Sequence, residues 1–120
     1  MSEDTLIKAE RFLNYLFDTI EEKRSGEQFL FDMVQEIKKQ EEGFQKDIIK
    51  ALGIWLYSED EDKAIAAPRL MLLLSAVEYI PDLEKICDAI KGGKKYPAVN
   101  TTYIRSLESL RKTRDMMQGQ

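Results

Sequence analysis

The 120-residue sequence predicts an all-α fold: a single helical domain, residues 1–120, forming one compact bundle of five or six mostly antiparallel helices around a central apolar helix at about residues 67–80. Three observations predict this class. Apolar side chains recur three and four residues apart in several segments, which is the period of an amphipathic helix. Three prolines and six glycines leave few breaks in the chain. The connections between periodic segments are mostly short, which favours antiparallel neighbours.

Three amphipathic helices are predicted before the central one, at about residues 4–24, 27–40 and 44–57. Ser2 or Asp4 can cap the first of them, because both side chains accept hydrogen bonds from backbone N–H groups. Each helix has one apolar face that we expect to be buried. The residues of these faces are Leu6, Ala9, Leu13, Leu16 and Ile20, then Leu30, Met33, Val34 and Ile37, then Phe44, Ile48, Ala51, Leu52, Trp55 and Leu56.

The central helix is predicted from the least polar stretch, AIAAPRLMLLLSAVEYI at residues 64–80. Its five consecutive apolar residues, 70–74, would cover the whole circumference of a helix, so we expect it to be covered on more than one side. Pro68 leaves two starting points open. The favoured one is near Ala67, which puts the proline in the first turn, and the alternative is a longer helix that begins near Asp60 and is kinked at Pro68.

Two further helices are predicted after the central one. Pro81 fits the first turn of a helix that ends before Gly92, where a left-handed C-cap is expected. Residues 92–100 are predicted to form a loop, and the last helix should run from Asn100 or Thr101 to about Met117. Its expected inward-facing residues are Tyr103, Ile104, Leu107, Leu110 and Met117.

The composition argues against enzymes and metalloproteins. The chain has no histidine, which is the commonest general base and metal ligand. It also lacks the common nucleophile, phosphate-loop and dinucleotide motifs, so we expect no enzyme activity, no cofactor and no metal. The acidic run at residues 59–62 lacks the glycine and the distant glutamate of a calcium loop, and we interpret it as a solvated helix start.

Location is predicted from the cysteine content and the hydropathy pattern. Cys87 is the single cysteine, which excludes an internal disulfide and favours the reducing cytoplasm. The apolar stretch at residues 64–80 is interrupted by Arg69 and Glu78, whereas a membrane span needs about 20 apolar residues. We therefore expect a cytoplasmic protein that does not contact the membrane.

A protein-binding role is the first functional hypothesis. Several large aromatic side chains exceed what a small core needs, and such side chains often anchor interfaces. The alternative is that the core absorbs them. The sequence therefore predicts a non-enzymatic interaction module that self-associates or is a small subunit of a larger intracellular assembly. Its candidate partner-binding residues are Phe29, Phe31, Trp55 and Tyr57.

Nucleic-acid binding is the second hypothesis, and it rests on an uneven distribution of charge. Residues 1–62 carry sixteen acidic and eight basic side chains, whereas residues 63–120 carry six acidic and ten basic ones. Cations in the second half could neutralise phosphates, and one tyrosine could stack on a base. The connection before the last helix is longer than the turn of a helix-turn-helix motif, which weakens the hypothesis. The candidate residues are Lys91, Lys94, Lys95, Tyr96, Arg105, Arg111, Lys112 and Arg114.

Overall fold

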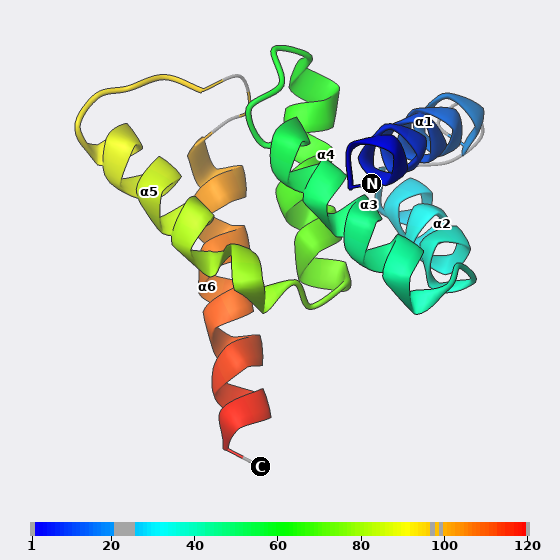
Figure 1. Ribbon diagram of the computed structural model, residues 1–120. Coiled ribbons are helices and arrows are strands. Elements are labelled where there is room, and N and C mark those ends of the chain that lie inside the picture. The colour runs from blue at the N-terminus through cyan, green and yellow to red at the C-terminus, as the bar shows by residue number, and fades with distance from the viewer. Residues whose placement is uncertain (1, 21–25, 97, 99, 120) are drawn as a thin grey trace. The chain divides into compact units, whose positions relative to one another are not determined.

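The computed structural model describes residues 2–20, 26–96, 98 and 100–119 (Figure 1). These residues form six α-helices and one short 3-10 helix, with no strand among them, so the predicted all-α class is confirmed. The bounds are α1 Ser2–Ile20, α2 Gly26–Lys38, α3 Glu42–Trp55, α4 Glu61–Leu73, η2 Val77–Tyr79, α5 Ile80–Lys91 and α6 Asn100–Gln118. The predicted end of the first helix near Arg24 lies outside the described residues.

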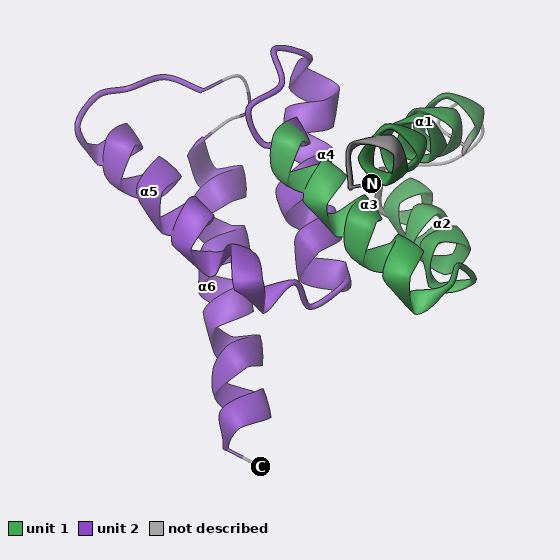
Figure 2. Cartoon of the chain, viewed as in Figure 1, with its two compact units in different colours: residues 1–54 green, residues 55–120 purple. Residues whose placement is uncertain are grey.

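The chain divides into two compact units, residues 1–54 and 55–120 (Figure 2). Unit 1 contains α1, α2 and nearly all of α3, whose last residue, Trp55, is the first residue of unit 2. Unit 2 contains α4, η2, α5 and α6. The single domain expected from the chain length stays a prediction.

Unit 1 is built from amphipathic helices, and the described residues of their predicted apolar faces are buried except Leu6 and Phe44, which are half-buried. The side chain of Ile20 lies outside the described residues. Ala9 and Leu13 of α1 and Met33 and Ile37 of α2 are fully buried. Two edge-to-face aromatic pairs connect the helices. The rings of Phe17 and Phe29 join α1 to α2 with centroids 5.3 Å apart, and those of Phe12 and Phe44 join α1 to α3 at 5.6 Å. Pairs of this geometry add to the stabilisation that burial alone provides.

In unit 2, α4 starts at Glu61, so the favoured start near Ala67 is wrong and the alternative with an internal proline is the observed one. The cause is the cap. The Asp60 carboxylate accepts hydrogen bonds from the backbone N–H groups of Asp62, at 3.0 Å, and Lys63, at 3.4 Å. Asp60 therefore satisfies groups that a helix start leaves without partners. Pro68 lies inside the helix and has no N–H to donate to the carbonyl of Ala64.

The end of the central helix also differs from the prediction. α4 ends at Leu73 and not at Ile80, because Ser75 adopts a left-handed backbone with φ of 54° and the chain continues into η2. Leu70 and Met71 are fully buried, whereas the three leucines at 72–74 are half-buried. The complete covering expected of residues 70–74 is therefore limited to the first two.

In unit 2, α4 and α5 both pack against α6. α5 runs antiparallel to α6, whereas α4 and α6 run in the same direction, so this pair is an exception to the expected antiparallel neighbours (Figure 1). Pro81 occupies the first turn of α5 as predicted. The predicted left-handed cap at Gly92 is wrong, because Gly92 has φ of −81° and Gly93 has φ of 100°.

The inner face of α6 is narrower than the sequence predicts. Tyr103, Leu107 and Leu110 are buried as expected, and Ser106 is buried with them. Ile104 and Met117 were expected to face inward, and both are exposed. Ile104 is rotated about 100° from Tyr103 and so leaves the inner face. Met117 continues the inner face, but it is the second-last residue of α6, and the C-terminal end of this helix extends past α5 (Figure 1).

Candidate functional site

The four candidate partner-binding aromatics fall into two classes. Phe29 and Trp55 are buried, and they contribute to the core. Phe31 and Tyr57 keep 50% and 53% of their surface exposed. Phe31 belongs to unit 1 and Tyr57 to unit 2, so the structure describes these two exposed rings on separate units.

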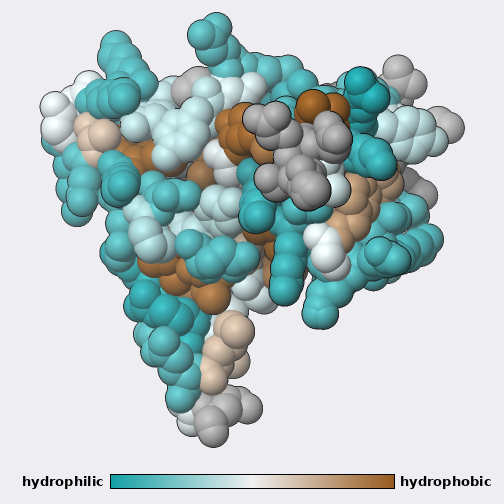
Figure 3. All heavy atoms as spheres, viewed as in Figure 1, coloured by the Kyte–Doolittle hydropathy of each residue, from teal (hydrophilic) through white to brown (hydrophobic). Residues whose placement is uncertain are grey.

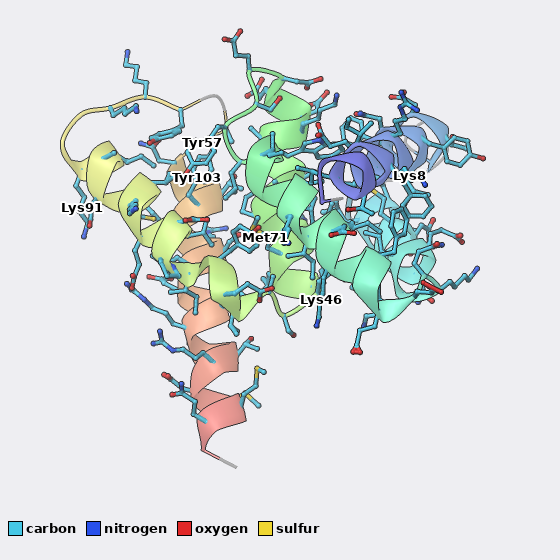
Figure 4. All side chains as sticks on the ribbon, in the orientation of Figure 1. Lys8, Lys46, Tyr57, Met71, Lys91 and Tyr103 are labelled. Carbon is cyan, nitrogen blue, oxygen red and sulfur yellow. The ribbon has the colours of Figure 1, made fainter. Side chains whose placement is uncertain are left out.

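Tyr57 is the outer member of a tyrosine cluster in unit 2, formed by Tyr57, Tyr96 and Tyr103. The ring centroids of Tyr57 and Tyr96 are 6.5 Å apart, and those of Tyr96 and Tyr103 are 5.7 Å apart. Figure 4 shows Tyr57 and Tyr103 near the start of α6. Burial and, to a smaller extent, the charge of Asp82 raise the pKa of Tyr57. The cluster therefore leads from an exposed ring to a fully buried one, and burial favours the neutral hydroxyls of Tyr57 and Tyr103.

The Tyr103 hydroxyl is the buried end of this cluster. It is shielded from solvent and makes no hydrogen bond of standard geometry with the described residues. Burial raises the pKa of Tyr103, and the nearby backbone N–H of Ala98 offsets part of the increase. A buried hydroxyl without a well-aligned partner lowers stability. Substitution of Tyr103 is therefore a direct test of how this hydroxyl affects the stability of unit 2.

The basic candidates before α6 lie on an exposed segment. Lys91 ends α5, where Figure 4 shows its side chain at the helix end, and Lys94 and Lys95 follow in the loop. The Lys94 ammonium lies 5.2 Å from the centre of the Tyr96 ring, within the range of a cation–π interaction. The structure thus brings Lys94 and Tyr96 together, as a phosphate-and-base contact would require.

The basic candidates on α6 do not form one surface. Arg111 donates a 2.8 Å hydrogen bond to the Glu84 carboxylate of α5, and this bond raises the pKa of the guanidinium. The Arg114 side chain lies 3.6 Å from the carboxylate of Asp115. Arg105 and Lys112 are exposed, and their spacing of seven residues places them on the same side of the helix.

A cleft of about 310 Å³ lies between α4 and α6, entirely within unit 2, and we call it the α4–α6 cleft. α4 supplies two apolar residues and an arginine, and α6 supplies four hydroxyl side chains and a second arginine. The lining residues are Ile65, Arg69, Leu72, Thr101, Thr102, Arg105, Ser106 and Ser109.

Among the residues that line this cleft, Arg105 is the one that the sequence analysis selected as a candidate. A signal was present on the last helix, where the hydroxyls at 101, 102, 106 and 109 and the arginine at 105 share one side at helical spacing. No comparable signal marked the other wall. Arg69 lies in the most apolar stretch, and a single arginine there does not by itself indicate a cleft.

Two familiar kinds of feature are absent from the described ranges. No three cysteine or acidic side chains there come together as a metal site would require. Nor is any helix among those residues both long and apolar enough to cross a membrane. The acidic run includes Asp60, whose carboxylate is engaged in capping α4.

Comparison with protein-family models, curated proteins and solved structures finds no match for this chain.

Proposed function

We propose that this chain is a non-enzymatic interaction module that self-associates or forms a small subunit of a larger assembly. The observation that supports it most is the bare end of α6. Leu107 and Leu110 are buried, and Met117, seven residues beyond Leu110, continues the same face with 57% of its surface exposed. Met116 beside it is 70% exposed. A helix face that packs along most of its length and is then left bare is well suited to a partner helix.

Figure 3 supports the same reading of α6. The end of this helix carries hydrophilic surface on one side and more hydrophobic surface on the other. Methionine side chains are flexible and polarizable, so they adapt to different binding surfaces. The proposal includes a cytoplasmic location, which the single buried thiol of Cys87 fits.

The test compares two double variants by sedimentation over a range of protein concentrations. Met116→Lys with Met117→Lys removes the apolar surface, and we expect it to abolish self-association or the capture of a stable partner. Met116→Leu with Met117→Leu is the matched control, because it keeps the apolar character of the helix end and should retain binding. A wild-type chain that is monomeric at all concentrations and captures no partner would contradict the proposal.

Nucleic-acid binding is a second candidate, favoured by the contact between Lys94 and Tyr96. An exposed cation next to a half-buried aromatic ring suits a flexible single strand, whose phosphates and bases both need partners. Lys94→Glu with Lys95→Glu should weaken binding to a single-stranded oligonucleotide, and wild-type affinity should fall steeply with salt. Lys85→Glu, an exposed site on α5, is the control. No retention of the wild-type chain on a polyanion column at low salt would exclude this candidate.

A further inference from the structure

The α4–α6 cleft has a one-sided charge distribution. Arg69 comes from one wall and Arg105 from the other, and none of the eight lining residues is acidic. Guanidinium groups pair with phosphate and carboxylate oxygens through parallel N–H donors. Two arginines from opposite walls of one small cleft therefore bring several N–H donors to its lining.

The lining residues also differ in depth, as a cleft with an open mouth and a closed floor requires. Thr101 and Arg105 are exposed and lie at the mouth, whereas Arg69 and Thr102 are half-buried. Ser106 is buried, with 4% of its surface exposed, and lies at the floor. A ligand in the cleft would therefore meet hydroxyl side chains that range from exposed to buried.

The first turn of α6 adds a further attraction for negative charge. Thr101 and Thr102 directly follow Asn100, the first residue of this nineteen-residue helix. The backbone N–H groups of a first helical turn have no partner within the helix, and the helix dipole is positive there. The cleft thus combines the start of a long helix with arginines and hydroxyls, which are independent sources of affinity for an oxyanion.

The volume of the cleft and the apolar side chains of its α4 wall restrict the ligand further. Ile65 and Leu72 supply apolar surface from α4, so the cleft is not purely polar. Its volume of about 310 Å³ is at the small end of the range for ligand pockets, which begins at about 300 Å³. We propose that the α4–α6 cleft binds a small molecule that carries a phosphate group, with Arg69 and Arg105 pairing with the phosphate and Ile65 and Leu72 contacting an apolar portion.

The test measures binding of phenyl phosphate to the full chain by calorimetry and by amide chemical shifts, at fixed ionic strength. Benzyl alcohol serves as the uncharged control. We expect shifts at the start of α6 with phenyl phosphate and none with benzyl alcohol. Arg105→Gln and Arg69→Gln should each lower affinity by roughly 10-fold or more, the usual effect of losing one charge-assisted hydrogen bond. Lys112→Gln removes a cation from α6 outside the cleft and should leave affinity unchanged.

Three outcomes would overturn the inference. One is an equal loss of affinity in Lys112→Gln, which would mean that the basic helix attracts anions without a site. Another is binding of phenyl phosphate without shifts at Thr101 and Thr102. The last is binding of a single-stranded oligonucleotide, with shifts at the start of α6, by a chain that ignores phenyl phosphate. That outcome would assign the arginines to a nucleic acid. Each variant is first checked for native helix content by circular dichroism, and a variant that fails is replaced by Thr102→Val, for which the same loss of affinity is expected.

Discussion

The two compact units have similar lengths but different kinds of backbone. Unit 1 consists of regular amphipathic helices joined by edge-to-face phenylalanine pairs. Unit 2 holds an internal proline at Pro68 and left-handed residues at Ser75 and Gly93, and the α4–α6 cleft lies there as well. The contrast shows that apolar periodicity is enough to describe regular helices. Caps and turns decide the geometry where helices must end and leave room between them.

The largest expected effect compares the two cores directly. Leu70→Ala in unit 2 and Leu13→Ala in unit 1 each remove a fully buried side chain, so each should lower the free energy of unfolding by about 2–5 kcal/mol. Denaturation by urea is followed by circular dichroism and by the fluorescence of Trp55. Chains of about 60 residues are only marginally stable alone, so we expect the two signals to change together in both variants.

Separate transitions for the two signals would show that the two units unfold independently. If Leu13→Ala shifts the circular dichroism transition and leaves the Trp55 fluorescence transition unchanged, the chain contains two independently folding domains, and the predicted single domain is wrong. Leu72→Asp provides an internal check. Because Leu72 is half-buried, it should cost less stability than an aspartate at Leu70.

The next effect concerns the turn that ends α5. Gly93→Ala places a side chain at φ of 100°, which L-residues rarely adopt, and should cost about 1–2 kcal/mol of stability. Gly92→Ala is the matched control. Its φ is −81°, and an added Cβ would be 3.5 Å from the Ala89 carbonyl oxygen, an ordinary contact. Equal losses in both variants, measured by thermal unfolding, would mean that the left-handed turn has no special role.

The cap of α4 should have a similar or slightly smaller effect. Asp60→Ala removes the acceptor for two backbone N–H groups and should cost about 1 kcal/mol in urea unfolding. Asp60→Asn keeps a capping oxygen, so it should retain most of the stability. If the two variants lose the same amount, charge at the acidic run matters more than the hydrogen bonds of the cap.

The smallest effect at neutral pH is expected at Tyr103, and it grows in alkali. Burial raises the pKa of Tyr103 in the folded chain above the ordinary value of 10.0. Ionisation of this group therefore does not affect stability below pH 10.0. Stability falls as the pH rises from 10.0 through the folded pKa, because the buried tyrosinate is disfavoured in the folded chain. Tyr103→Phe should change stability by less than about 1 kcal/mol at neutral pH, since the hydroxyl makes no well-aligned hydrogen bond.

The alkaline part of this prediction has a control in unit 1. Above pH 10.0, Tyr103→Phe should lose less stability than the wild-type chain. Tyr15→Phe, at an exposed position on α1, should behave like wild type over the whole pH range. Urea unfolding at several pH values separates the two. An identical alkaline loss in wild type and Tyr103→Phe would show that other groups control it.

Much of the fold follows from the sequence, and the reasons for the differences are local. The apolar faces of α1 and α2 were predictable because many regularly spaced residues agree on them. The start of α4 was not, because Pro68 is compatible with two starts and the Asp60 side-chain hydrogen bonds decide between them. Met117 has the spacing of a core residue, but spacing does not reveal where the neighbouring helix ends.

The candidate site was predictable to a smaller extent. Lys94 and Tyr96 are close in sequence, so their contact follows from the chain itself. Phe29 and Phe31 have the same chemistry, and which of them is buried depends on how the helices pack. The α4–α6 cleft joins residues about 35 positions apart on two helices, and the periodicity of each helix does not say how the two pack against each other.

The single thiol of the chain gives a way to follow the motions of unit 2. Cys87 lies on the buried face of α5, and burial raises its pKa, so the reactive thiolate is scarce while the helix is in place. A thiol reagent can modify it at an appreciable rate only when α5 separates from its neighbours. The modification rate therefore reports the opening equilibrium of that helix, from a reporter that the natural sequence already contains.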